Sequence, residues 1–190
     1  LLGGAVGVVF AGTPLRGARV VGMPLRREIV ELDRRAARAE AAEHFGLRAD
    51  RPTLLVTGGS TGARRLNETM AAATPRVLGA GWQLLHITGE GRGGGAEALP
   101  GLVVQSYCDR MDLAFAIADL AVCRAGAATV SELAAVGLPA VLVPYPVGNG
   151  EQELNARDLV SAAGARLVND ADFTPEWVAR ELVPLLERRD

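Results

Sequence analysis

Short apolar segments alternate along the chain with longer segments in which apolar residues recur at helical spacing. The apolar segments have no polar alternation, as in strands of a parallel sheet that is covered on both faces. Strands are predicted at residues 5–10, 18–21, 53–57, 83–88, 102–105, 119–123, 140–143 and 165–168. Helices are predicted at 25–45, 63–78, 111–117, 130–135, 154–162 and 175–187. Repeated strand–helix units predict an α/β fold with a Rossmann-like parallel sheet flanked by helices.

The pattern breaks at Met23-Pro24, between the second strand and the first helix. A proline in a short glycine-containing segment is typical of a linker. We therefore predict that residues 1–22 are the end of a preceding domain with its linker, and that 23–190 form a separate domain. The chain begins without Met, inside an apolar segment, so we expect most of that preceding domain to be absent; it ends at residues 187–190 on what resembles an unfinished helix.

The composition is that of a globular domain, because 49% of the residues are hydrophobic and 22% are charged. No apolar run approaches the roughly 18 residues that a membrane-spanning helix needs. A net charge of −2 provides no basic surface for nucleic acid, which we do not expect as a partner. Cys108 and Cys123 lack metal-site spacing, so we expect buried thiols in a reducing compartment, and neither a metal site nor a cofactor is predicted.

The most informative motif spans residues 123–155, CRAGAATVSELAAVGLPAVLVPYPVGNGEQELN. A strand ends at Cys123, the chain breaks at Ala125-Gly126, and a helix is predicted to begin near Thr129 with Glu132 in its first turn. A turn of small residues before a helix lets backbone N–H groups point at an anion. A carboxylate one turn further can accept hydrogen bonds from ribose hydroxyls. Together these features predict a nucleotide site.

A second glycine turn, GGSTGAR at residues 58–64, also lies between a predicted strand and a helix. Gly58 and Gly59 permit a tight turn that can approach a phosphate closely, and Ser60 adds a hydroxyl. Its spacing fits neither the GxGxxG dinucleotide motif nor a P-loop, since no lysine follows. Because ligands bind at the carboxyl ends of parallel strands, two such turns in one sheet favour a shared site.

These two motifs, with GMPLR at residues 22–26, closely resemble the MurG family of bacterial N-acetylglucosaminyltransferases. The resemblance runs from about Val21 to the C-terminus and implies the C-terminal, donor-binding half of a two-domain GT-B enzyme. It implies inverting transfer of N-acetylglucosamine from UDP-N-acetylglucosamine to the 4-hydroxyl of lipid-linked N-acetylmuramic acid, the lipid I acceptor. The parent protein is then expected at the cytoplasmic face of the membrane as a peripheral protein, which contacts the membrane surface through the missing N-terminal half.

The resemblance also implies roles for individual residues. Glu132 would hold the ribose hydroxyls and Ser60 a phosphate, while backbone groups near Cys108 would bind uracil. Gln152 would contact the sugar hydroxyls, and no catalytic base is expected in this chain. The whole set implied for UDP-N-acetylglucosamine is Arg26, Ser60, Cys108, Ala127, Ala128, Thr129, Glu132, Gln152 and Asn155, with Gly58 and Gly59 in the phosphate turn. Two positions depart from the family pattern, Glu151 in place of Gln and Met23 in place of Asn.

Other interpretations stay open on the sequence. The chain could belong to another GT-B glycosyltransferase or to the UDP-N-acetylglucosamine epimerases, or it could bind a nucleotide without catalysis. Glu132 could stabilise a helix dipole, and Gln152 and Asn155 could cap a helix. Arg124 could simply pair with a carboxylate, and His86 suits the core of a strand better than a catalytic role.

Overall fold

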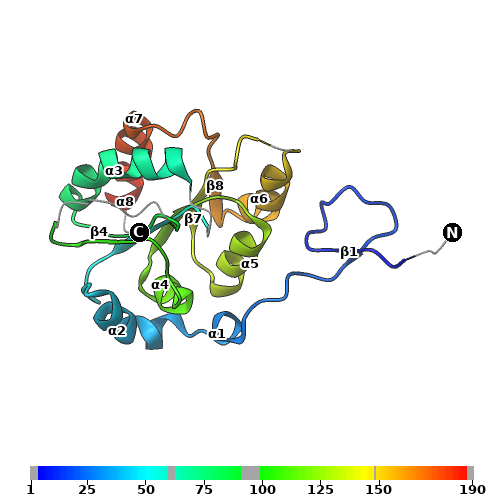
Figure 1. Cartoon of the computed structure of the whole chain (residues 1–190), viewed down its shortest axis with the longest axis horizontal. Helices are drawn as coiled ribbons and strands as arrows, with labels where there is room; N and C mark the ends of the chain where they lie inside the picture. The colour runs from blue at the N-terminus through cyan, green and yellow to red at the C-terminus, as the bar shows by residue number, and fades with distance from the viewer. Residues whose placement is uncertain (1–3, 60–62, 91–98, 148, 188–190) are drawn as a thin grey trace.

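A computed structural model describes residues 4–59, 63–90, 99–147 and 149–187 of the chain (Figure 1). Its centre is a six-stranded, fully parallel sheet with the strand order β5-β4-β3-β6-β7-β8. The strands are β3 (Thr53–Thr57), β4 (Gln83–Ile87), β5 (Leu102–Gln105), β6 (Leu120–Cys123), β7 (Ala140–Leu142) and β8 (Ala165–Leu167). The predicted parallel α/β sheet is confirmed.

Helices cover both faces of this sheet, because alternate strand residues point to opposite sides. Leu55 faces a core formed with α2 (Arg34–Phe45), α4 (Met111–Ile117) and α5 (Ala127–Val136). Its neighbours Leu54 and Val56 face a second core, formed with α3 (Arg64–Gly79) and the C-terminal helices. All three strand residues are fully buried, which explains the unbroken apolar runs in the sequence.

Successive strands are added on one side of β3 up to β5 and on its other side from β6 onward. From β3 the chain builds outward to β4 and β5, then returns so that β6 pairs with the free side of β3, Thr57 opposite Cys123. The segments that follow these two strands therefore begin beside each other. In open α/β sheets such a switch point, at the carboxyl ends of the strands, is where ligands bind.

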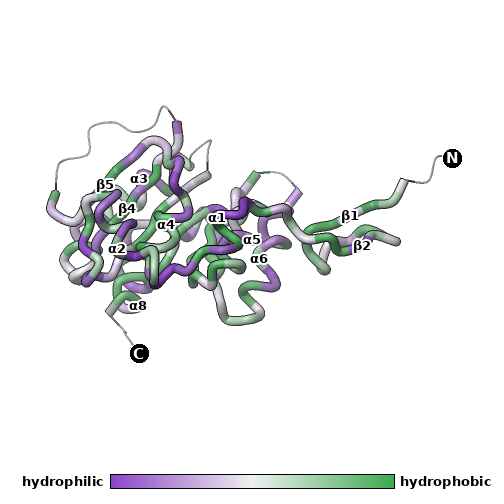
Figure 2. Tube along the Cα trace, turned by 90° about the horizontal axis from the view of Figure 1, so that it is seen from below, coloured by the Kyte–Doolittle hydropathy of each residue, from purple (hydrophilic) through white to green (hydrophobic). Residues whose placement is uncertain are grey.

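An N-terminal arm, residues 4–22, projects from the body that contains the sheet (Figures 1 and 2). In it β1 (Gly7–Val8) and β2 (Arg19–Val20) pair in parallel with each other and not with the larger sheet. Val20 and Val21 are 59% and 71% exposed. The arm ends where the sequence predicts a linker, while the division into two domains stays a prediction.

The single helix predicted at 25–45 is wrong. The structure has two helices there, α1 (Arg27–Val30) and α2, separated by three residues. Asp33 is the N-cap of α2, and its carboxylate accepts hydrogen bonds from the N–H groups of Arg35 and Ala36, both at 3.0 Å. An aspartate that can bond to backbone N–H groups favours a helix start over a helix interior.

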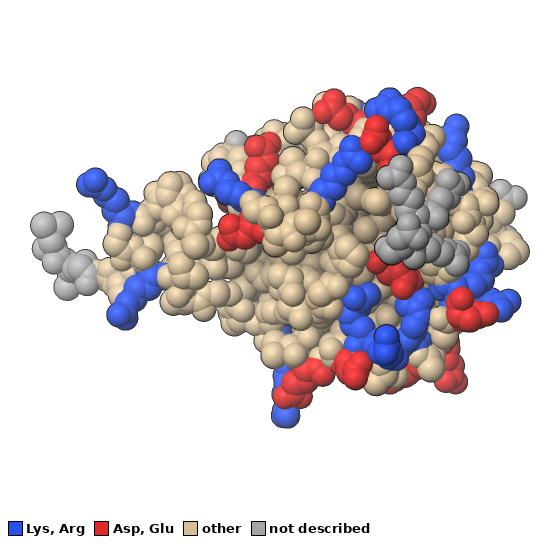
Figure 3. All heavy atoms as spheres, turned by 180° about the vertical axis from the view of Figure 1, so that it is seen from behind, with Lys and Arg blue, Asp and Glu red and all other residues tan. Residues whose placement is uncertain are grey.

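The C-terminal helical segment is continuous but not uniform. It runs through α7 (Pro175–Trp177), a π-helical segment η1 (Val178–Leu182) and α8 (Val183–Glu187). Pro184 has no N–H to donate to the preceding turn, and the widened segment ends two residues before it. Among the described helices, none is long and apolar enough to cross a membrane. Acidic and basic side chains are intermixed over the body on the face that Figure 3 shows.

His86 lies within β4 and is only 4% exposed. Its Nε2 is 3.1 Å from Oδ1 of Asn67 on α3, and the amide nitrogen of Asn67 donates to the carbonyl of Thr88 at 2.8 Å. Because the amide nitrogen donates there, Oδ1 is the acceptor and His86 donates through Nε2. Burial lowers the pKa of His86 from 6.5 to about 4. His86 is therefore a neutral structural histidine that joins β4 to α3.

Acidification should destabilise the fold through His86. In the unfolded chain this histidine takes up a proton near pH 6.5, but in the folded chain only near pH 4, so stability falls as the pH drops through that window. The loss should reach about 2 kcal/mol at pH 5. Urea unfolding of the wild type and His86→Gln at pH 7 and pH 5 measures it. The stability difference between the two proteins should shrink by that amount at pH 5, and a difference independent of pH would contradict the prediction.

Candidate functional site

Two adjoining cavities open beside the carboxyl ends of β3 and β6. The smaller has a volume of about 300 Å³ and is lined by Arg26, Tyr107, Cys108 and Glu132, among others. The larger has a volume of about 900 Å³ and includes Gln152. Gly59 and Thr129 line both cavities, so the two glycine turns meet where the cavities join.

The turn after β3 contributes Gly58 and Gly59 to this junction. Gly59 has φ +83°, a left-handed conformation that residues with a Cβ adopt only with strain. Its N–H donates to Oγ1 of Thr57 at 3.3 Å. Ser60, the predicted phosphate contact, lies outside the described residues. Helix α3 starts after Ala63, and no hydrogen bond from a described side chain caps its N-terminus.

The turn after β6 brings a second helix N-terminus to the same place. Gly126 is the N-cap of α5, and no side chain of the described residues caps this helix either. The first N–H groups of a helix have no partner within it, so those of Ala127, Ala128 and Thr129 can bind an anion. The predicted start near Thr129 is wrong, because the small residues Ala127 and Ala128 already belong to the helix.

This earlier start moves Glu132 from the first turn of the helix to the second. The alternative in which Glu132 stabilises the helix dipole thus loses its basis, since that effect is confined to the first turn. Its side chain is 18% exposed and lines the smaller cavity. Burial raises the pKa of Glu132, and Arg26, whose Nη2 lies 3.8 Å from Oε1, opposes this shift. The two residues assigned by resemblance are therefore a loose ion pair at one cavity.

Cys108 and its neighbours form another wall of the smaller cavity. The segment between β5 and α4 carries them, with Tyr107 exposed and Cys108 9% exposed. Burial raises the pKa of the Cys108 thiol, and it raises that of Cys123 to about 12. Both thiols are neutral at physiological pH, so neither is a nucleophile there.

Gln152 and Asn155 lie on α6 (Glu151–Ser161), which begins three residues before its predicted start at Leu154. Neither residue caps this helix, so that alternative is wrong. Oε1 of Gln152 accepts the N–H of Tyr145 at 2.9 Å, and the amide of Asn155 donates to the carbonyl of Ala125 at 3.1 Å. Asn155 thus fastens α6 to the turn after β6, while Gln152 lines the larger cavity.

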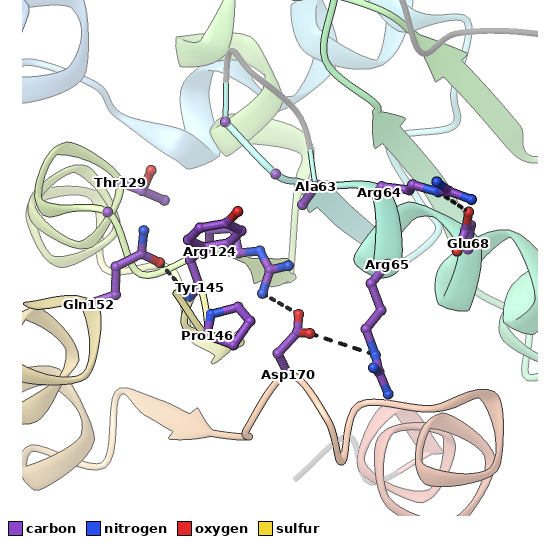
Figure 4. Close-up of a pocket in the computed structure, with 13 residues that line it drawn as sticks. Ala63, Arg64, Arg65, Glu68, Arg124, Thr129, Tyr145, Pro146, Gln152 and Asp170 are labelled. Atoms are coloured by element: carbon purple, nitrogen blue, oxygen red, sulfur yellow. Dashed lines mark hydrogen bonds and ion pairs between the residues drawn. The ribbon is translucent and has the colours of Figure 1, made fainter. Parts of the chain in front are cut away.

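Sequence reasoning missed Asp170, which lies in the larger cavity near Arg124 (Figure 4). Arg124 Nη1 is 2.6 Å from Asp170 Oδ1, and both side chains are 10% exposed. The interpretation of Arg124 as a partner of a carboxylate is therefore confirmed. Asp170 follows β8 at the carboxyl edge of the sheet, and this position after a strand is the signal that could have identified it.

Residues 53–190 match the family model described as the glycosyltransferase family 28 C-terminal domain. The chain belongs to glycosyltransferase family 28. The match covers every strand of the six-stranded sheet and both glycine turns. The recognition made from the motifs is confirmed at the level of this family.

Curated relatives carry the name UDP-N-acetylglucosamine--N-acetylmuramyl-(pentapeptide) pyrophosphoryl-undecaprenol N-acetylglucosamine transferase. One from Leifsonia xyli subsp. xyli is 62% identical over 185 residues, which are 97% of this chain and 51% of the relative. One from Streptomyces coelicolor is 52% identical over 185 residues, 95% of this chain and 51% of the relative. The chain thus spans about half the length of the curated relatives it matches.

Solved structures agree with the fold. MurG from Acinetobacter baumannii superposes with a TM-score of 0.68 at 29% identity, over 88% of this chain and 50% of that one. A calicheamicin glycosyltransferase superposes with a TM-score of 0.60 at 19% identity, over 75% of this chain and 35% of that one, and shows the fold alone. The predicted fold class, one half of a GT-B glycosyltransferase, is confirmed.

Gly59→Ala should lower the free energy of unfolding by about 1 kcal/mol, the cost of placing alanine in a left-handed backbone conformation. A Cβ there would meet no atom within 4 Å, so backbone strain alone acts. Gly79→Ala, in α3 and equally unobstructed but without a positive φ, is the matched control and should be neutral or slightly stabilising. Urea unfolding of both variants measures the difference. Equal stabilities would show that the conformation of Gly59 is not constrained.

Proposed function

We propose that this chain is the donor-binding part of an inverting glycosyltransferase that moves N-acetylglucosamine from UDP-N-acetylglucosamine to lipid-linked N-acetylmuramic acid pentapeptide. The observation that carries the proposal is the smaller cavity, where Glu132, Cys108 and the N-terminus of α5 face one space. The shared name of the relatives supports this substrate pair over that of another GT-B enzyme or an epimerase.

The geometry supports one placement of the donor along the two cavities. Uracil would lie against the backbone near Cys108, and Glu132 would accept hydrogen bonds from the ribose hydroxyls. The diphosphate would lie at the junction, where Gly59 permits close approach and the N–H groups at Ala127 to Thr129 point outward. The sugar would then extend into the larger cavity toward Gln152.

In the proposed reaction the acceptor 4-hydroxyl attacks the anomeric carbon of the donor sugar. The bond from this carbon to the diphosphate oxygen breaks, UDP leaves with the bonding electrons, and the configuration inverts. Negative charge grows on the diphosphate, where the N-termini of α3 and α5, neither of them capped by a described side chain, supply fixed dipoles that need no reorganisation. The proton of the hydroxyl goes to a base outside this chain, so this chain alone should bind donor but turn over poorly.

The domain assignment belongs to the same proposal. We infer that residues 1–22 end the acceptor-binding domain and that 23–190 form the donor-binding domain. The arm supports this division, because β1 and β2 pair only with each other among the described strands. The lipid-linked acceptor implies peripheral attachment of the complete protein to the cytoplasmic face of the membrane, through the part that precedes residue 23.

Truncating Glu132 should weaken donor binding more than it weakens the fold. Glu132→Ala removes the charged acceptor of the ribose hydroxyls, which should cost about 1.5–3 kcal/mol of binding free energy. This equals on the order of a ten- to hundredfold loss of UDP affinity, measurable by calorimetry. The variant should also bind UDP and 2′-deoxy-UDP with equal affinity, because no carboxylate remains to accept a hydrogen bond from the ribose 2′-hydroxyl.

Glu43→Ala, which removes an exposed glutamate from α2, is the matched control and should leave UDP affinity unchanged. Melting temperatures of both variants test whether the fold is affected. A large drop in melting temperature for Glu132→Ala with unchanged UDP affinity would show that Glu132 is structural.

The chain should select uridine nucleotides. If backbone groups beside Cys108 read uracil, UDP-N-acetylglucosamine should bind more tightly than ADP- or GDP-linked sugars in calorimetric titrations. We also expect a chelator to leave the affinity unchanged, because no metal site is predicted from the sequence. Equal affinity for the three nucleotides would contradict the assignment of the smaller cavity.

A further inference from the structure

The loop between β7 and α6 depends on an arginine from another strand. Arg124 follows β6 and is 8% exposed. Its Nη1 donates to the carbonyls of Val143 and Pro144 at 3.1 Å and 3.0 Å. The loop contains two prolines, Pro144 and Pro146, which have no N–H for hydrogen bonds within the loop. The guanidinium therefore fixes the start of this loop through two of its carbonyls.

The same loop orients Gln152. Tyr145, the next residue, lies with its ring centroid 5.5 Å from the guanidinium carbon of Arg124. Its N–H donates to the side chain of Gln152 at 2.9 Å, as the dashed line in Figure 4 shows. An unbroken series of contacts thus leads from Arg124 through Tyr145 to Gln152.

Asp170 supplies the charge that keeps Arg124 in this position. Its Oδ1 forms an ion pair with Nη1 of Arg124 at 2.6 Å, and this nitrogen donates its hydrogen bonds to the two loop carbonyls. Arg65 on α3 approaches the other carboxylate oxygen at 3.7 Å. A buried guanidinium without a counter-ion is costly, so loss of the carboxylate should release Arg124 from the loop. The pair joins the segments after β6, β7 and β8 at one point.

We propose that Asp170 and Arg124 are positioning residues that set the orientation of Gln152 and thereby the selectivity of this site for the sugar of its nucleotide-sugar donor. This inference rests on the proposed function, which places that sugar in the larger cavity. Asp170 and Arg124 act on the sugar through the loop at 143–146. UDP alone, which fills the smaller cavity and the junction, does not depend on them.

The test compares affinities for UDP and UDP-N-acetylglucosamine by calorimetry in this chain. Asp170→Asn keeps the shape of the side chain but removes its charge. We expect the affinity for UDP-N-acetylglucosamine to fall on the order of fivefold more than the affinity for UDP. Asp170→Glu should restore part of the loss. The control Asp50→Asn breaks an exposed Arg–Asp pair of equal N···O distance, 2.6 Å, and should change neither affinity.

A double-mutant cycle with Gln152→Ala tests the route. If Asp170 acts through Gln152, Asp170→Asn should have no further effect on the affinity ratio once Gln152 is truncated. An effect of equal size in both backgrounds would mean that Asp170 reaches the sugar by another route, and it would overturn the positioning role.

The remaining outcomes separate this inference from the proposed function. If the wild type binds both ligands and Asp170→Asn weakens both equally, or neither, the inference fails and the proposed function stands. If both affinities fall equally because the fold is damaged, the melting temperature of Asp170→Asn will fall as well. This outcome also contradicts a selective role for Asp170. If the wild type binds neither ligand, the proposed function fails and the inference fails with it.

Discussion

Parallel pairing of β3 with β6 is the constraint on which the rest of the site depends. It places Thr57 opposite Cys123, so the turns that begin at Gly58 and Arg124 start one strand spacing apart. Because the chain leaves β3 toward one edge of the sheet and β6 toward the other, the two turns diverge and leave space between them. Each turn leads into a helix whose N-terminus faces this space. Two helix N-termini beside one gap thus follow from one strand pairing.

Arginines fasten the elements around this sheet. All twenty basic residues are arginine, whose forked guanidinium can reach several acceptors at once. Arg34 on α2 donates to the carbonyls of Phe115, Ala118 and Gly137, and burial lowers its pKa. Arg38 donates to both carboxylate oxygens of Asp119 and to three carbonyls, those of residues 49, 51 and 117. Arg124 likewise donates to two carbonyls, at the opposite ends of the strands, where the candidate site lies.

These arginine contacts have different consequences at the amino ends and at the carboxyl ends of the strands. Arg34 and Arg38 join α2 to the end of α4 and the start of β6, a purely structural role. Arg124 instead supports the loop that carries Tyr145 and Pro146, which line the larger cavity together with its counter-ion Asp170. In our proposal the Arg124–Asp170 pair therefore contributes to donor recognition as well as to stability, whereas Arg38 and Asp119 line neither of these two cavities.

The order of strands and helices, the parallel sheet and the family were predictable from sequence, because unbroken apolar runs and glycine turns are local signals. Among the residues predicted for the site, Gly58, Gly59, Thr129, Glu132 and Gln152 line the two cavities, and they lie in two local motifs, residues 123–155 and one earlier turn. Local patterns failed at the helix starts, where capping by Asp33 and the small residues before Thr129 decided the boundary. Local patterns could not predict the contact of Arg124 with Asp170. Those residues are 46 positions apart, and only the pairing of β6 with β7 and of β7 with β8 brings them together.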